Sequence, residues 1–378
     1  MLTTTRLDAN PTLTFDGDEA VQTDNELVEC YQDVISDRRL SWTAHHHWKR
    51  CLGSGGQGVV YLSERRGAEG FTLPVAVKVF SPEVFPDARA YDEEMLRMGG
   101  VAATVAQIQQ DNLAGVQNFV DRQRIRMMVM EWIDGYDLQR LMVPSMLVKI
   151  KARVSSRRWA RINNILVTAG PEQPRLKPGV AVAVVRDGLA ALAALHREGI
   201  VHSDIKPSNI MLKQTGPAKI IDIGSAFPYE APPSNRTCTP AYAAPEVLEG
   251  QASMPQSDLA SLGYVLIELL AGRKPFAGLK YRTELLEAKR VLPHRLTELL
   301  PTEVTVNELL MNFCRRLIAP DPNCRFPSAE AAELVDEEGA AAFHKQLVKG
   351  DLSSEYDNEI RIWLEELKEL EEDAADDE

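Results

Sequence analysis

The chain of 378 residues is 44% hydrophobic and 26% charged, and it contains 23 glycines and 22 prolines. This composition supports a sizeable core and excludes collagen-like, disordered and disulfide-scaffold proteins, and the five irregularly spaced cysteines indicate a soluble protein of a reducing, cytoplasmic compartment. The net charge of −13 argues against a nucleic-acid partner, because such binding needs basic groups that neutralise phosphates, and the lack of any run of about 18 apolar residues argues against a membrane span.

Residues 1–47 are polar and rich in Thr and Asp, and we expect them to form a partly disordered appendage. A short amphipathic patch within it has apolar residues at helical spacing, namely Leu27, Tyr31, Val34 and Ile35. Three histidines, His45 to His47, close the segment without a cysteine or carboxylate at ligand spacing. We interpret them as a polar linker rather than as a metal site.

From residue 48 to 133 the pattern alternates between strands and turns, with one helical stretch around 88–98. The first turn carries the glycines Gly53, Gly55 and Gly58, followed by Val60. Glycines let a phosphate approach the backbone closely, although a simple hairpin turn explains the pattern equally well. A dinucleotide-binding turn would need a helix next, and a Walker A loop would need Gly-Lys-Ser/Thr; neither follows.

A lysine, Lys78, interrupts the next apolar strand after Val75, Ala76 and Val77. Such a lysine normally lies at an edge unless an anion holds it. In the following helix, Glu94 shares a face with Tyr91 and Met98, whereas Glu93 has Arg97 four residues on. We therefore predict that Glu94 pairs with Lys78, with Glu93 as the fallback.

From residue 134 to 345 the chain is mostly helical, and segments 180–199 and 258–272 predict buried helices that end at a glycine. Between them, Asp204 is followed by Lys206 and Asn209, and Asp222 follows a further apolar run. Carboxylate and amide oxygens are hard ligands that suit Mg²⁺, which also takes phosphate oxygens. Asp and Asn are also common turn residues, so the joint order and spacing carry the signal.

Taken together, these motifs resemble the eukaryotic-type protein kinase family, over about residues 48–335. The resemblance implies an α+β, bilobal fold with a small β-rich N-lobe (48–133) and a larger, mainly helical C-lobe (134–345). It implies that Asp204 accepts the substrate hydroxyl proton, with Lys206 beside it, and that Asn209 and Asp222 hold Mg²⁺.

The resemblance also implies an ATP site between the lobes. Lys78 would hold the α- and β-phosphates, tethered by Glu94. Met130 would be the gatekeeper, and Glu131 to Ile133 the hinge that reads adenine. The implied nucleotide-contacting residues are Gly53, Gly55, Gly58, Val60, Ala76, Lys78, Met130, Glu131, Ile133 and Asp137, the last at the ribose.

Several further residues match the serine/threonine branch of the family. Lys206 in DIKPSN is typical of that branch, and Thr239 fits the threonine that contacts the catalytic Asp and Lys. Glu246 resembles the glutamate that closes the activation segment, with Arg325 as its expected partner. Asp258 resembles the helix aspartate that supports the catalytic loop.

Two positions depart from the family pattern. Ser203 replaces the arginine that usually precedes the catalytic Asp and gathers a phosphate on the activation segment. We therefore hypothesise that activity does not need phosphorylation there, with Thr237 as the residue that tests it. Ile223 replaces the usual aromatic residue after Asp222. Isoleucine keeps the apolar packing, but it argues against an inactive state that depends on the flip of an aromatic ring.

The charge is unevenly distributed. Residues 351–378 have thirteen acidic residues against two basic ones, and residues 145–178 have eight basic residues against one acidic. The basic stretch is longer than the family's usual link between two C-lobe helices. One interpretation is a solvated surface insertion, helical at residues 155–167. The alternatives are a docking site for an acidic partner and a docking site for the chain's own acidic tail. A tail contact would be exposed and screened by salt.

The tail, residues 346–378, contains one amphipathic helix. Its apolar face consists of Ile360, Trp363, Leu364, Leu367 and Leu370. A helix packed on its own C-lobe is favoured over one that docks a partner, because isolated helices are marginal in water.

The sequence thus predicts an ATP- and Mg²⁺-dependent kinase that phosphorylates Ser or Thr on protein substrates. One alternative is a pseudokinase that acts as an ATP-binding or scaffold module, because fold alone does not fix function. The other is a kinase-like phosphotransferase for small molecules, which the peptide-docking residues Thr239, Glu246 and Arg325 disfavour.

Overall fold

The computed structural model describes residues 45–233, 238–334, 339–343 and 353–376. The apolar patch predicted at residues 27–35 and the test residue Thr237 lie outside these ranges. From His46 onward the described elements belong to one unit.

A five-stranded sheet in the order β1-β2-β3-β5-β4 forms the N-lobe. Its central strand is rich in valine, whose branched side chain suits a pleated sheet, and Val75, Ala76, Val77 and Lys78 are all buried there. β3 pairs antiparallel with both β2 and β5, and β5 pairs antiparallel with β4. The strands are β1 (His45–Gly55), β2 (Gly58–Arg66), β3 (Thr72–Phe80), β4 (Val116–Arg122) and β5 (Ile125–Glu131).

One long helix, α2 (Ala88–Val105), packs against β4 of this sheet. Asp87 caps its start by accepting a hydrogen bond from the Ala90 N–H at 2.8 Å. Tyr91, Met95 and Met98 recur at helical spacing and are buried against the sheet. A short 3₁₀ turn, η1 (Pro82–Val84), joins β3 to the helix.

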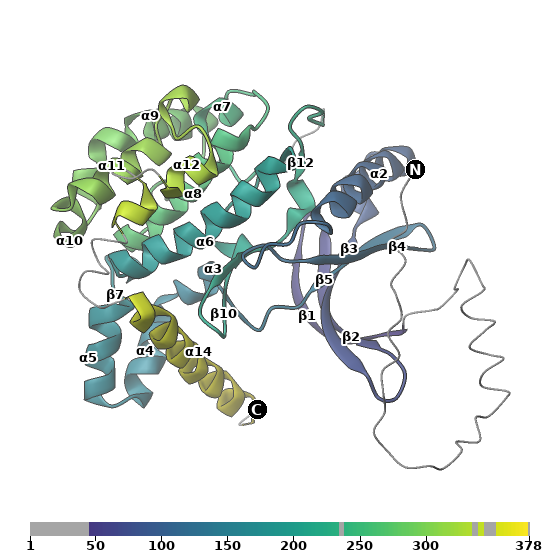
Figure 1. Ribbon diagram of the computed structural model, residues 1–378, viewed down its shortest axis with the longest axis horizontal. Coiled ribbons are helices and arrows are strands. Elements are labelled where there is room, and N and C mark those ends of the chain that lie inside the picture. Colours follow the sequence, from purple (N-terminus) through teal and green to yellow (C-terminus); the bar gives the residue numbers. More distant parts are fainter. Residues whose placement is uncertain (1–44, 234–237, 335–338, 344–352, 377–378) are drawn as a thin grey trace, which may run out of the picture. The chain divides into compact units, whose positions relative to one another are not determined.

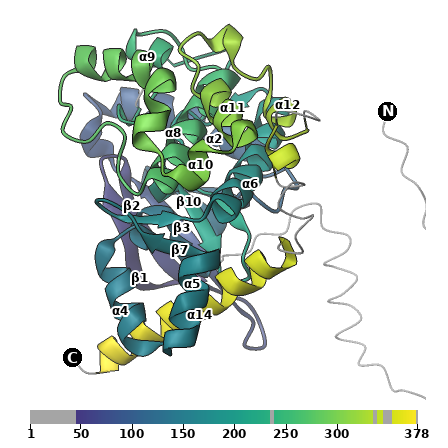
Figure 2. The same ribbon diagram turned by 90° about the vertical axis from the view of Figure 1, so that its left-hand side faces the viewer.

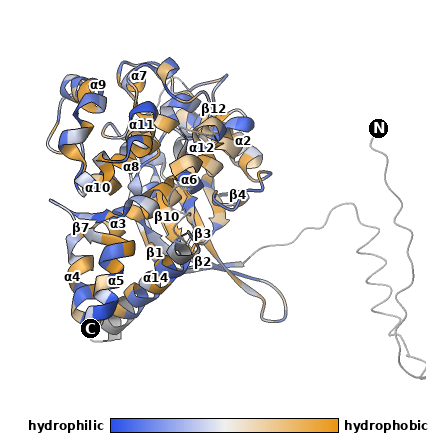
Figure 3. Ribbon diagram, turned by 60° about the vertical axis from the view of Figure 1, so that its left-hand side comes forward, coloured by the Kyte–Doolittle hydropathy of each residue, from blue (hydrophilic) through white to orange (hydrophobic). Residues whose placement is uncertain are grey.

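Two apolar helices form the core of the C-lobe: α6 (Pro178–Arg197) and α8 (Pro255–Ala271) contact each other, and Figure 3 shows the hydrophobic residues along them. By length and composition α6 is the one helix in the described ranges that passes as a membrane span. Most of it is buried inside the lobe, however, and it also packs against α12. It is therefore a core helix.

Further elements complete the C-lobe (Figure 1). Its helices include α3 (Leu138–Leu141), α7 (Pro245–Leu248), α9 (Arg282–Leu299), α10 (Thr302–Thr305), α11 (Glu308–Leu317) and α12 (Ala329–Leu334). Its strands are β6 (Gly135–Asp137), β7 (Val167–Ala169), β8 (Pro174–Leu176), β9 (Ile200–Val201), β10 (Ile210–Lys213), β11 (Ala218–Ile220) and β12 (Phe227–Pro228). Its 3₁₀ turns are η2 (Pro207–Asn209), η3 (Ile223–Ser225) and η4 (Pro322–Cys324).

The basic stretch folds into helices α4 (Pro144–Arg153) and α5 (Ser156–Ile165), followed by the β7–β8 hairpin. Helix α14 (Ser353–Asp376) packs against both helices, as Figures 1 and 2 show. The predicted apolar face of the tail is buried at Ile360, Trp363, Leu364 and Leu367. The tail therefore packs on its own C-lobe.

Ion pairs join the same elements. Arg158 pairs with Glu366 at 2.8 Å, and Glu359 pairs with both Arg158 and Arg161. The expectation of an exposed, salt-screened contact is wrong at Glu359, which is 3% exposed. The apolar face of the helix carries this carboxylate inward, so a large part of the contact is shielded from solvent ions.

Candidate active site

The residues of the predicted catalytic loop meet around the carboxylate of Asp204. Lys206 Nζ lies 2.7 Å from Asp204 Oδ2, and the Thr239 hydroxyl donates to Asp204 Oδ1 at 2.7 Å. Lys206 Nζ also donates to Thr239 Oγ1 at 3.1 Å. Asn209 Nδ2 also donates to Asp204 Oδ2, at 3.3 Å, so both carboxylate oxygens are held by neighbouring side chains.

The buried carboxylate of Asp258 fixes the backbone of this loop through hydrogen bonds. Its two oxygens accept hydrogen bonds from the His202 and Ser203 N–H groups at 2.9 and 2.8 Å, and His196 Nε2 lies 2.9 Å from Oδ2. Ser203 has a φ of +66°, a conformation that needs such support in a residue other than glycine. The predicted supporting contact of Asp258 is present.

Lys78 reaches across the site to Asp222. Its Nζ lies 2.6 Å from Asp222 Oδ1 and 2.7 Å from Gln57 Oε1, and it is almost fully buried. Burial raises the pKa of Asp222, but the Lys78 ammonium and the Gly224 N–H lower it by more. The net result is a pKa below the usual value of an aspartate. Gln57, in the glycine-rich turn, also donates to Ser225 Oγ at 3.1 Å. Sequence reasoning missed Gln57, although it lies between two of the singled-out glycines.

The predicted partner of Lys78 is wrong in this structure. Both oxygens of Glu94 accept hydrogen bonds from Arg97, at 2.5 and 2.9 Å, and Arg97 also donates to the Ala226 carbonyl at 2.7 Å. The fallback is wrong too, because Glu93 pairs with Arg89 on the exposed side of the helix. Arg97 lies one turn from Glu94, and the Ala226 carbonyl fixes its guanidinium there, while Asp222 already matches the charge of Lys78.

The glycine-rich turn joins β1 to β2. Gly58 needs to be glycine for the fold itself, because its φ is +136° and a side chain would collide with the Val79 carbonyl. At Gly53 and Gly55, in contrast, an added Cβ would meet no described atom within 4 Å. The described fold does not require these two glycines, which leaves room for a group that approaches the backbone.

The predicted adenine-side residues lie on β2, β3 and β5 and in the segment that follows β5. Val60 is paired with Lys78, and Ala76 with Met130, in the sheet register; Ala76, Met130 and Ile133 are buried. Asp137 caps α3 by accepting from the Arg140 N–H at 2.9 Å. Burial of its carboxyl raises the pKa of Asp137, although that N–H acts in the opposite direction.

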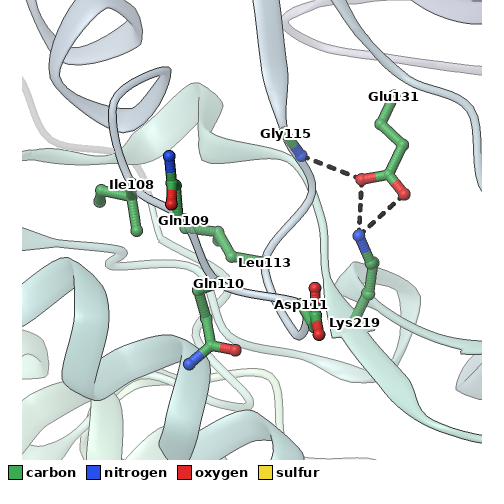
Figure 4. Close-up of a pocket in the computed structure, with 8 residues that line it drawn as sticks. All are labelled: Ile108, Gln109, Gln110, Asp111, Leu113, Gly115, Glu131 and Lys219. Carbon is green, nitrogen blue, oxygen red and sulfur yellow. Dashed lines mark hydrogen bonds and ion pairs between the residues drawn. The ribbon is translucent and has the colours of Figure 1, made fainter.

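The side chain of Glu131 does not face these residues. Its two oxygens lie 2.8 and 2.6 Å from Lys219 Nζ, and one accepts from the Gly115 N–H at 3.2 Å. These groups line a pocket of about 480 Å³ together with residues of the loop after α2, including Gln110 and Asp111 (Figure 4). Any contact of Glu131 with a nucleotide is therefore left to its main chain.

The activation-segment anchors pair as predicted. Arg325 binds both oxygens of Glu246, at 2.7 and 2.8 Å, and both residues are buried. Ser257 also donates to Glu246, at 2.7 Å. Sequence reasoning missed a second anchor, in which the Tyr242 hydroxyl donates to Glu268 Oε2 at 2.6 Å. A hydroxyl and a carboxylate 26 residues apart have no local pattern that links them.

The donor set at Asn209 and Asp222 suits a magnesium–nucleotide complex. Asn209 Nδ2 donates to the Asp204 main-chain oxygen at 2.8 Å, which leaves its amide oxygen as the free ligand atom of the group. Within the described ranges, no group of three His, Cys, Asp or Glu residues could hold a metal by itself. One carboxylate and one amide suit Mg²⁺, which takes its remaining ligands from water and phosphate.

Comparisons with known proteins agree with this geometry. A family model described as the protein kinase domain matches residues 46–335. Serine/threonine-protein kinase PkaA of Streptomyces coelicolor is 32% identical over 74% of this chain and 47% of its own length. Serine/threonine-protein kinases PknL of Mycobacterium bovis and PknA of Mycobacterium tuberculosis are 33% and 30% identical, over 60% and 63% of this chain.

The chain spans about half the length of these curated relatives. The family match, however, covers well over half of the chain, and it includes both lobes and the Asp204 loop. The chain belongs to the eukaryotic-type protein kinase family, in its serine/threonine branch.

Proposed function

We propose that this protein transfers the γ-phosphoryl group of ATP to Ser or Thr hydroxyls of protein substrates. The observation that carries the proposal is the arrangement at Asp204, whose carboxylate is held by Lys206 and Thr239. Thr239 belongs to the segment that Glu246 and Arg325 anchor, so substrate docking and proton acceptance share one framework.

In this proposal each side chain has one task. Asp204 accepts the proton of the attacking hydroxyl, and Lys206 beside it carries positive charge toward the transferring phosphoryl group. Asn209 and Asp222 hold Mg²⁺, which supplies further neutralisation when it is bound with ATP. Positioning and charge neutralisation are most of what phosphoryl transfer requires of a protein.

The nucleotide-contacting set is part of the same proposal. Gly53, Gly55 and Gly58 cover the phosphates with their N–H groups, and Lys78 contacts the α- and β-phosphates. Val60, Ala76 and Met130 line the adenine side, the main chain of Glu131 to Ile133 forms the hinge, and Asp137 contacts the ribose. The room beside Gly53 and Gly55 supports the covering role.

The test is phosphotransfer from ATP labelled at the γ-phosphate, with Mg²⁺, to the protein itself and to a generic basic protein. Label on Ser or Thr that is lost in Asp204→Asn supports the proposal. Binding of Mg-ATP without transfer, measured as thermal stabilisation of about 2.7 kcal/mol at a hundredfold excess over Kd, would favour the pseudokinase alternative. If the protein neither binds Mg-ATP nor transfers label, both the kinase function and the pseudokinase alternative are wrong.

We also propose that activity does not depend on phosphorylation of the activation segment. Ser203 replaces the phosphate-gathering arginine, and its hydroxyl lies 3.0 Å from the Ser253 hydroxyl instead. Thr237→Ala is therefore expected to keep phosphotransfer activity within about twofold of the wild type. Loss of activity in Thr237→Ala together with rescue in Thr237→Asp would contradict this.

For the basic stretch we propose that its occupant is the chain's own tail rather than an acidic partner. The ion pairs of Arg158 and Arg161 with Glu359 support this assignment. So does the buried apolar face of α14, since a charged partner alone would not need one.

A further inference from the structure

One buried amine in the C-lobe has no part in the functions described so far. Lys289 lies on α9 and is fully buried. Its ammonium lies 3.9 Å from the ring centre of Tyr264 and 4.0 Å from that of Phe276. It donates one hydrogen bond, of 2.7 Å, to the Ala241 carbonyl.

Burial of a lysine at this position carries an unfavourable desolvation free energy. Burial lowers the pKa of Lys289 well below its usual value, and its contacts are two aromatic faces and a carbonyl rather than a carboxylate. An apolar side chain of similar length would fill the same space without the desolvation cost. The fold alone therefore does not explain why the side chain ends in an amine. We attribute it to the hydrogen bond that the amine donates to the Ala241 carbonyl.

That hydrogen bond ends one short turn away from the catalytic carboxylate. The N–H groups of Tyr242 and Ala243 both donate to the Thr239 carbonyl, at 2.9 and 3.0 Å, so Ala241 lies inside a turn that begins at Thr239. The Thr239 hydroxyl in turn donates to Asp204 Oδ1. Lys289 is thus connected to the catalytic carboxylate through the turn at Thr239 and two hydrogen bonds.

We propose that Lys289 is a positioning residue, which holds the turn at residues 239–243 from α9 so that Thr239 keeps Asp204 oriented for the substrate hydroxyl. This inference rests on the proposed kinase function. It extends that function to a helix that contributes no group to the site itself. The neighbouring Tyr242–Glu268 hydrogen bond fixes the same turn from α8, so the two anchors hold it from two helices.

The test variant is Lys289→Met, which keeps the length and the contact with both rings but removes the donor. We expect kcat for a protein substrate to fall about five- to tenfold, the size of one lost hydrogen bond, with the KM for ATP within about twofold. Amide hydrogen exchange at residues 238–243 should accelerate. The thermal midpoint should not fall, because a buried amine without a carboxylate partner has been replaced by an apolar side chain.

The matched control is Arg295→Met on the same helix, whose guanidinium is exposed and pairs with Glu298 one turn away. It should change neither kcat nor exchange at residues 238–243. If Lys289→Met lowers the thermal midpoint and kcat together while exchange at 238–243 is unchanged, the residue is only structural and the proposal is wrong. Unchanged kcat and exchange would also overturn it.

The two proposals can be distinguished experimentally. Should the wild-type protein transfer no label, the kinase function fails, and the exchange measurement on Lys289→Met still reports on the contact with the turn. Faster exchange at 238–243 then supports the positioning contact, and unchanged exchange refutes it. Normal activity in the wild type with unchanged exchange in the variant refutes the Lys289 inference alone.

Discussion

At the scale of single residues, Thr239 is the side chain on which the proposed chemistry depends most directly after Asp204. Thr239→Val removes the hydroxyl that donates to Asp204 while it preserves the shape of the side chain. A hydrogen bond to a charged group contributes about 1.5–3 kcal/mol. We expect kcat to fall about 10- to 100-fold with little change in ATP affinity, measured by steady-state kinetics at saturating Mg-ATP.

The control is Thr302→Val, at the exposed start of α10, which should leave kcat unchanged. Equal activity in wild type and Thr239→Val would show that Lys206 and Asn209 orient the carboxylate without the Thr239 hydroxyl. A parallel loss in both variants would indicate general destabilisation rather than a role at Asp204.

At the scale of elements, a buried ion pair joins α7 to the rest of the C-lobe. Arg325→Met leaves the Glu246 carboxylate without its guanidinium, and breaking such a pair costs about 3–5 kcal/mol. Urea unfolding at neutral pH measures the loss. The double variant with Glu246→Gln should recover part of it, because the uncompensated charge is gone.

The same pair makes stability depend on pH. Burial raises the pKa of Glu246, but Arg325 and Ser257 lower it more strongly, so its folded value lies below the ordinary 4.5. Its stabilisation is thus complete above the unfolded pKa and is lost as pH falls through the folded value. Between about pH 5 and pH 3 the wild type should lose more stability than Glu246→Gln does. Parallel curves for the two proteins would contradict this.

Helix α14 depends on the apolar face that it presents to α4 and α5. Trp363→Ala removes a side chain that is 1% exposed, and truncating a buried aromatic residue costs about 3–5 kcal/mol. The free energy of unfolding, measured with urea, should fall by this amount. Trp48→Ala, at an exposed tryptophan of the N-lobe sheet, should cost far less. A loss in Trp363→Ala as small as the one expected for Trp48→Ala would mean that α14 adds little to the stability of the C-lobe.

At the scale of the whole molecule, the sequence predicted what depends on local order and periodicity. The fold class, the meeting of Asp204 with Lys206 and Thr239, and the Glu246–Arg325 pair all follow from motifs with defined spacing. The partner of Lys78 could not be predicted, because Glu94 and Asp222 can each pair with a cation and only the folded geometry gives Asp222 to Lys78 and Glu94 to Arg97. Arg97, one turn from Glu94, was the signal that pointed the other way.

Long-range contacts without a motif were harder to predict. Lys289 contacts Ala241 through a carbonyl, a group that every residue carries, so no residue type in the sequence marks the contact. Packing of the tail helix on its own C-lobe was the favoured prediction, but its contact with the basic stretch was one of three alternatives, because opposite charges alone do not distinguish the chain's own helix from another protein. The buried Glu359 required the three-dimensional arrangement of α4, α5 and α14.

The distance along the chain between the arginines of α5 and Glu359 has a consequence for synthesis. Arg158 and Arg161 precede Glu359 by 201 and 198 residues. At about 5–20 residues per second, a ribosome needs on the order of 10–40 s to reach Glu359 after it has made these arginines. During that interval α4 and α5 present apolar and basic surface to the cell without the helix that covers it. A nascent chain that ends before residue 353 therefore exposes a surface to chaperones that the finished protein covers.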